Sequence, residues 1–294
     1  MNHQCTRLAR ARVCSWVATT VLLGGCGGGG GEVLDQGTQD SSVDSGPIDM
    51  GNDSLGNPPA TFETHNVLFE TFMGAWIGYV PDAYVRLAEV RADVGGQLVA
   101  VSLHSSDAFE NPASIARLNL HLAANFPEGV VDAQPPPVGR DYWGEVINMA
   151  LLRESDCGLA IDASSVAHIE VRAACEAGVE GEVRLNVWAV EAEALGPAQA
   201  NVDNATVGHP YEGAGDPIVD FVHENVLRAF LTSGTEGEVV VTSAGTVSRF
   251  FDGSAACTDT DCTVVAFISV FDAVSGENHV VAVERATYGA VLPW

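Results

Sequence analysis

Three aspartates and two cysteines crowd a short stretch near the C-terminus. Asp252, Asp259 and Asp261 surround Cys257 and Cys262. Carboxylate oxygens are ligands that Ca²⁺ prefers, and a disulfide would fix such a loop in place. The stretch is therefore a candidate calcium site. An acidic turn is the favoured interpretation, because Asp side chains bond to nearby backbone amides in turns.

Four cysteines follow position 26, namely Cys157, Cys175, Cys257 and Cys262. An even count indicates disulfides if the chain is exported. Of the three connectivities, we favour the two local ones, Cys157–Cys175 and Cys257–Cys262. The first would contribute about 3 kcal/mol on the chain-entropy model, and the second would hold the tip of a hairpin. A zinc site is the alternative, but the chain has no Cys-x-x-Cys spacing to support it.

Signatures of nucleophilic or metal-dependent catalysis are missing. The histidines His65, His104, His121, His168, His209, His223 and His279 form no HExxH motif. The chain contains no GxSxG elbow. It also has no lysine, which excludes a phosphate-binding-loop lysine and Schiff-base chemistry. A site assembled from distant acids and histidines stays open, because such pairing is spatial.

The charge balance is strongly acidic. The chain has 13 basic and 39 acidic residues. Removal of the first 25 residues takes away three arginines and no acid, which leaves a net charge of −29. Such a chain is not expected to bind nucleic acid, which requires clustered cations. Solubility outside the cell is the favoured interpretation, and attraction to divalent cations or a basic partner is the alternative.

The first 26 residues have the three zones of a secretory signal. Arg7, Arg10 and Arg12 precede an apolar stretch from Val13 to Leu23, and small residues then lead to Cys26. The apolar stretch is about half the ~20 residues that a membrane-spanning helix needs. The junction Leu23-Gly24-Gly25-Cys26 resembles the lipobox of bacterial lipoproteins.

That resemblance implies a cellular location and a membrane anchor. The thiol of Cys26 would carry diacylglycerol, and the chain would be cut before it and tethered by its acyl groups. Gly27 in place of Asp favours the outer membrane of a Gram-negative cell envelope. The expected partner is the membrane, reached through the lipid.

The mature chain divides into a tether and a folded domain. Residues 1–25 are the expected signal peptide, and residues 26–60 hold the lipidated Cys and a segment rich in Gly and Asp. Such a composition cannot bury enough apolar surface to fold. Residues 61–294 form the expected β-rich domain, with a possible subdivision near 201–215.

Period-two alternation dominates this domain. Apolar residues alternate with polar ones around Val99–Leu103, Ile169–Ala173 and Val183–Val187. Two further runs, 264–270 and 280–288, flank a turn and predict a hairpin. Such patterns are typical of antiparallel strands with one buried face. We therefore predict a mainly β protein, an antiparallel sandwich or barrel-like domain of about eight to twelve strands.

About two helical insertions are expected in that domain. One would begin at Asp216-Pro217 and end at Gly234, and the other would be capped by Asp141. The stretch 114–125 is ambiguous. Its alternating Ala116, Leu118, Leu120 and Leu122 favour a strand, although Asn111-Pro112 could start a helix.

The segment Gly74-Ala75-Trp76-Ile77-Gly78 resembles the GxW signature on the first strand of lipocalin-like barrels. In that family the Trp packs beneath a basic residue of the last strand, and Arg285 lies on a late predicted strand. The resemblance implies a cup for a small apolar ligand, with Trp76 and Arg285 as ligand-binding residues.

Three functions follow from these features. The favoured one is a lipid-anchored envelope lipoprotein with a binding or structural β domain and no catalytic role. The alternatives are an exported hydrolase with an assembled acidic/His site and a lipocalin-like carrier. The sequence predicts no cofactor, apart from the candidate calcium ion.

Overall fold

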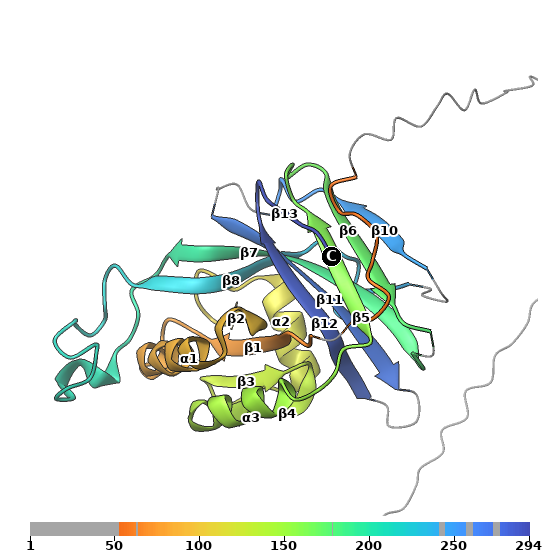
Figure 1. The fold of residues 1–294 in the computed structure, drawn as a ribbon. Coiled ribbons are helices and arrows are strands. Elements are labelled where there is room, and N and C mark those ends of the chain that lie inside the picture. The colour runs from red at the N-terminus through yellow and green to blue at the C-terminus, as the bar shows by residue number, and fades with distance from the viewer. Residues whose placement is uncertain (1–52, 63, 178, 241–244, 257–260, 273–276) are drawn as a thin grey trace, which may run out of the picture. The chain divides into compact units, whose positions relative to one another are not determined.

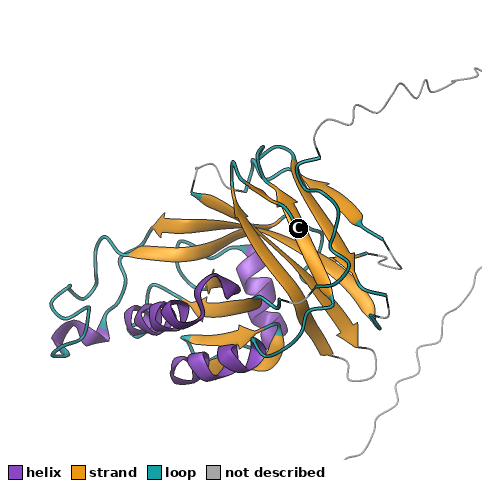
Figure 2. Cartoon of the chain, in the orientation of Figure 1, coloured by secondary structure: helices purple, strands orange, loops and turns teal. Residues whose placement is uncertain are grey.

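The computed structural model describes residues 53–62, 64–177, 179–240, 245–256, 261–272 and 277–294. In this part of the chain it has thirteen strands and three α-helices, so the prediction of a mainly β fold is confirmed (Figures 1 and 2). The helices are α1 Val80–Val94, α2 Pro112–His121 and α3 Trp143–Ala150, and the short 3-10 turns are Gly95–Gln97, Arg140–Tyr142 and Val202–Ala205. None of the described helices is long and apolar enough to cross a membrane.

The strands form two sheets. The larger has the order β12-β11-β7-β8-β2-β1-β3-β4, with β9 paired to β7, and the smaller has the order β10-β6-β5-β13. Their bounds are β1 Val67–Met73, β2 Leu98–His104, β3 Glu128–Val131, β4 Gln134–Gly139, β5 Cys157–Asp162, β6 Ile169–Cys175, β7 Glu182–Leu195, β8 Val222–Phe230, β9 Glu238–Val239, β10 Val247–Phe251, β11 Cys262–Asp272, β12 Glu277–Thr287 and β13 Val291–Leu292.

The smaller sheet packs on the β7, β11 and β12 part of the larger one, and together they form the predicted sandwich. Its core contains alternate residues of both sheets, such as Ile161 and Val171 facing Leu185 and Ile268. Strands β11 and β12 pair antiparallel, as the hairpin pattern predicts, and strands β6 and β7 include the predicted runs 169–173 and 183–187.

The other half of the large sheet is an α/β unit that the alternation did not predict. Strand β1 runs parallel to β2, and β2 runs parallel to β8. Every residue of β1 and β2 is buried, because the helices lie on both faces of these strands. The residues of α1 and α3 share a core with one face, and those of α2 share a core with the opposite face.

Two local predictions are wrong. The stretch 114–125 is not a strand, since Pro112–His121 forms helix α2, whose Asn111 side chain accepts a hydrogen bond from the Ser114 amide at 3.0 Å. The stretch after Asp216-Pro217 is not a helix, since 222–230 is strand β8, which lies between β7 and β2. The strands on either side of 201–215 therefore pair in one sheet.

The helix predicted from Asp141 is present as α3. Its buried Trp143, Ile147 and Ala150 follow the spacing of one helical face. Helix α1 was not predicted, although Pro81 stands in its first turn and Gly95, with φ of 62°, follows its end. Its apolar face lies on the strands β1 and β2 that position the candidate site.

Candidate functional site

The parallel strands β1 and β2 end at the same edge of the large sheet. In α/β sheets, ligands bind in the crevice outside the carboxyl ends of the parallel strands. Met73 and His104 are the register partners at this edge, and the loop after Met73 leads into helix α1. Any site of the α/β unit is therefore to be sought around residues 74–80 and 104–109.

Asp107 organises this edge. Its carboxylate accepts hydrogen bonds from His104 Nδ1 at 2.7 Å, from the Ala75 amide at 2.8 Å and from the Phe109 amide at 2.8 Å. Burial would raise the pKa of Asp107, but the hydrogen bond and charge of His104 and the two amides outweigh it and hold the pKa below its usual value. The carboxylate thus fixes the β1–α1 loop to the end of β2.

A second imidazole lies beside His104. The His223 ring centroid, on β8, is 5.0 Å from that of His104, and the rings of Phe109 and Phe221 are each 5.0 Å from His223. Burial, followed by the neighbouring His104, lowers the pKa of His223 to about 4. His223 is therefore a neutral, buried ring at neutral pH, with its Nε2 3.3 Å from the Pro197 carbonyl.

The connection between β7 and β8 folds back over the β1–α1 loop, and Figure 1 shows its teal ribbon extending beyond those strands. The amide of Ala200 donates to the Ala75 carbonyl at 2.8 Å, and that of Val202 donates to the Gly78 carbonyl at 3.1 Å. A Cβ at Gly78 would lie 2.3 Å from Val202 Cγ1, so a larger residue does not fit. The Ala75 and Gly78 carbonyls of the β1–α1 loop are therefore already hydrogen-bonded to the β7–β8 connection.

Two aromatic rings remain exposed at this edge. Trp76 is 57% exposed and Tyr79 is 49% exposed. The Trp76 indole donates to the Ser105 carbonyl at 2.9 Å, and its ring lies 6.2 Å from that of Phe126. The guanidinium of Arg140 lies over the Tyr79 ring at 4.7 Å. The rings are thus held in place while one side of each faces solvent.

The start of α1 carries no thiol. A Cys-x-x-Cys pair near a βαβ unit indicates thioredoxin-like dithiol chemistry. Residues 74–83, which form the β1–α1 loop and the first turn of α1, contain no cysteine.

The lipocalin-like arrangement is not found. The described strands form no closed barrel, since both sheets are open. Trp76 lies in the β1–α1 loop rather than on the first strand, and Arg285 lies on β12, a strand that is not paired with β1 in the sheet. The structure therefore does not place Trp76 beneath Arg285, which lines a separate cavity.

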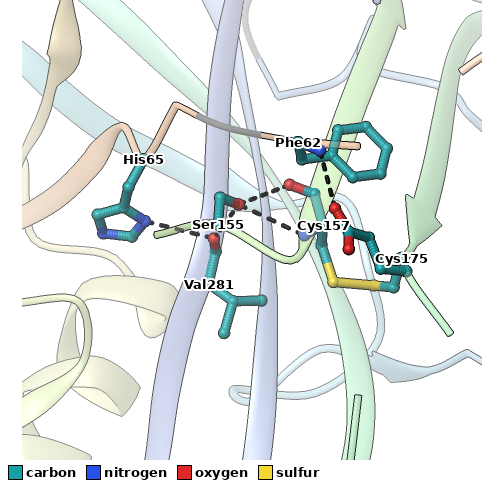
Figure 3. The surroundings of a disulfide bond; sticks show 7 residues. Phe62, His65, Ser155, Cys157, Cys175 and Val281 are labelled. Atoms are coloured by element: carbon teal, nitrogen blue, oxygen red, sulfur yellow. Dashed lines mark hydrogen bonds between the residues drawn. A yellow bond between two sulfur atoms is a disulfide. The ribbon is translucent and has the colours of Figure 1, made fainter. Parts of the chain in front are cut away.

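The predicted Cys157–Cys175 disulfide is present, and it joins register partners of β5 and β6. Figure 3 shows Phe62 beside it, with the Phe62 amide donating to Glu176 at 3.0 Å. Cys257 lies outside the described residues, so its pairing with Cys262 stays a prediction.

The candidate calcium ligands are only partly described, because Asp259 lies outside the described residues. Asp252 caps its own turn, where it accepts hydrogen bonds from the amide and hydroxyl of Ser254, and these hold its pKa below the usual value. Within the described part of the chain, no group of three His, Cys, Asp or Glu residues is arranged to hold a metal ion.

Two buried ionic clusters were missed by the sequence analysis. Arg117 of α2 pairs with Glu70 of β1, with Arg117 Nε 2.7 Å from the carboxylate, and its guanidinium lies 5.2 Å over the Trp188 ring. Burial would raise the pKa of Glu70, but the charges of Arg117 and His121 lower it to about 2. Elsewhere, buried Asp132 contacts His65 at 2.9 Å and Arg153 at 3.2 Å. These pairs join segments far apart in sequence, and no spacing motif signals them.

Comparison with known proteins shows the fold alone. No family model matches the chain, and no curated protein matches it. Among solved structures, HBP35 of Porphyromonas gingivalis is similar with a TM-score of 0.61 at 15% identity, over 80% of this chain and 78% of that one. Protein AGR_C_4864 from Agrobacterium tumefaciens gives a TM-score of 0.49 at 13% identity, over 78% of this chain and 96% of that one.

Proposed function

We propose that this chain is a lipid-anchored protein of the bacterial cell envelope whose folded domain binds a partner and does not transform a substrate. The support for the anchor is the signal-like N-terminus with its lipobox-like junction at Cys26. The support for binding comes from the edge where β1 and β2 end.

One observation carries the binding role. At this edge the side chains of His104, Asp107 and His223 are buried, and the large apolar side chains that remain exposed are those of Trp76 and Tyr79. Aromatic rings supply large contact area at little entropic cost, and for this reason they are enriched at the centres of interfaces. The surface is thus suited to recognition.

A hydrolase receives less support from the same geometry. His104 and Asp107 do lie within hydrogen-bond reach, as an acid–base pair requires. Their side chains, however, are only 0% and 4% exposed. A substrate cannot reach His104 unless Phe109 and His223 move, since both rings pack against it.

The anchor is tested by the substitution Cys26→Ser. Cells that express the wild type should incorporate radiolabelled palmitate into this protein and retain it in the outer-membrane fraction. The Cys26→Ser chain should take up no label and should appear in the soluble fraction after export. Label in the variant, or a wild-type N-terminus that still includes residues 1–25, would refute the anchor.

The binding role is tested with a photo-crosslinking amino acid at position 76. The matched control is position 250, because Phe250 is 56% exposed but lies on β10 in the smaller sheet. Illumination of intact cells should give a discrete adduct from position 76 and none from position 250. The absence of an adduct at position 76, or the same adduct at both positions, contradicts the proposed surface.

A further inference from the structure

A cavity of about 420 Å³ lies where β12 ends and the C-terminal strand begins. Its volume falls in the range of small-molecule sites, roughly 300–1,000 Å³. One part of its lining is apolar and the other is polar. The apolar part consists of Ala192, Ala286, Ala290, Val291 and Leu292, and the polar part consists of Asn225, Thr263, Arg285 and Thr287.

The polar residues gather for a structural reason. Thr263 of β11 is the register partner of Thr287 of β12, and Arg285 stands two residues before Thr287. Residues two apart on a strand share a face, and register partners do the same. Both hydroxyls and the guanidinium therefore lie on one side of this hairpin. Asn225 of β8, at φ of 51°, also lines the cavity, from a strand that β7 separates from β11.

Arg285 is unusual among the arginines of this acidic chain. Eight of the ten arginines in the described residues form ion pairs, namely Arg86, Arg91, Arg117, Arg140, Arg153, Arg172, Arg184 and Arg228. Within the same part of the chain, Arg285 and Arg249 have no such partner. Arg249 lies on the edge strand β10, whereas Arg285 lines the cavity. Its cationic group is thus available to an anion.

We infer that this cavity, the Arg285 pocket, binds a small monocarboxylate with a short apolar tail. The carboxylate accepts hydrogen bonds from the guanidinium of Arg285 and from the hydroxyls of Thr263 and Thr287. Guanidinium and carboxylate match in geometry and charge. The tail packs on Val291 and Leu292.

The charge of the chain favours a monocarboxylate over phosphate. The chain has a formal net charge of −26, so an approaching anion meets a repulsive field that grows with its own charge. A doubly charged phosphate meets more repulsion than a monocarboxylate. It also leaves the apolar wall without a partner. This inference depends neither on the lipid anchor nor on the Trp76 surface.

The test uses the mature chain with Cys26→Ser and follows hexanoate binding by calorimetric titration. Hexanoate should bind saturably. Arg285→Gln should weaken it at least about tenfold, the loss expected when a charge-assisted hydrogen bond is removed. The matched control Arg249→Gln should bind as the wild type does, since it removes the other arginine without an ion pair. Hexanamide, which is neutral, should bind at least about tenfold more weakly than hexanoate.

A second variant separates a loss of hexanoate binding from a folding defect. Thr287→Val keeps the shape of the side chain and removes one hydroxyl, and it should weaken hexanoate binding while the thermal unfolding midpoint stays near the wild-type value. Equal binding by wild type and Arg285→Gln would overturn the inference. So would inorganic phosphate binding more tightly than hexanoate, or the absence of saturable hexanoate binding.

Discussion

The buried His223 predicts how the stability of the domain depends on pH. Its pKa is lowered to about 4 in the fold, chiefly by burial and then by His104, whereas an unfolded His titrates near 6.5. Below pH 6.5 the unfolded chain therefore binds a proton that the folded chain refuses. Stability should fall as the pH drops from about 6.5 towards 4, and it should level off below that value with respect to this group.

The magnitude follows from these two values. One pKa unit corresponds to about 1.4 kcal/mol, so at pH 5 the proton that His223 lacks destabilises the fold by about 2 kcal/mol relative to pH 7. Below pH 4 the full effect is about 3 kcal/mol. Glu284 acts in the opposite direction, because burial raises the pKa of its carboxyl and acid therefore favours the folded form.

The assay is urea unfolding at pH 7, 6 and 5, followed by tryptophan fluorescence, on the wild type and His223→Phe. The variant keeps a ring among Phe109 and Phe221 but cannot be protonated. Its stability loss between pH 7 and pH 5 should be smaller than that of the wild type by about 2 kcal/mol. The effect of Glu284 cancels in this comparison. His168→Phe, which removes an exposed ring, is the control. Equal pH dependence in wild type and His223→Phe would refute the reasoning.

Three further changes test the packing by urea unfolding at pH 7. Replacement of both Cys157 and Cys175 by Ala should lower the free energy of unfolding by about 3 kcal/mol, since the bridge closes a separation of 18 residues, and no loss would contradict the bridge. Glu70→Gln should lower the free energy of unfolding by about 3–5 kcal/mol, because it leaves the Arg117 cation buried without its partner. A loss below 1 kcal/mol would contradict this ion pair. Gly78→Ala should lower the free energy of unfolding by about 1–3 kcal/mol, because the new methyl group clashes with Val202. Gly139→Ala, whose methyl group would point into open space, should lower it much less. Equal losses in the two variants would contradict the clash.

The sandwich could be predicted because its strands have one buried face. In 169–173 and 183–187 the apolar residues enter a single core, and the period of two appears directly in the sequence. Strands β1 and β2 are buried on both faces, so their pattern does not show whether the neighbouring strand is parallel or antiparallel.

Helix α2 was mistaken for a strand because two polar residues occupy its buried face. Arg117 and His121 lie four residues apart towards Glu70, while Leu120 and Leu122 are exposed. The apolar residues alone therefore alternate. Strand β8 was mistaken for a helix because its apolar spacing suits either form, and its place between β7 and β2 decides the outcome.

The candidate site could be predicted only in part. Trp76 and Arg285 were singled out from a resemblance, and the structure places them at different sites. The cluster of His104, Asp107 and His223 depends on residues more than a hundred positions apart that meet where β2 ends and β8 begins. The proximity of these side chains is determined by how the strands pair, so no spacing motif in the sequence signals it.

The segment that precedes β1 has a mechanical consequence. Asp53 pairs with Arg172 at 2.7 Å, Ser54 donates to Asp162 at 2.9 Å, and the Trp294 indole donates to the Gly56 carbonyl at 3.2 Å. A pull on the chain upstream of Asp53 would first load the contacts of Asp53 and Ser54 to β6 and β5, two strands that the Cys157–Cys175 disulfide joins covalently. Tension would thus enter the molecule at a disulfide-linked hairpin and would reach the pairing of β1 only after those contacts yield.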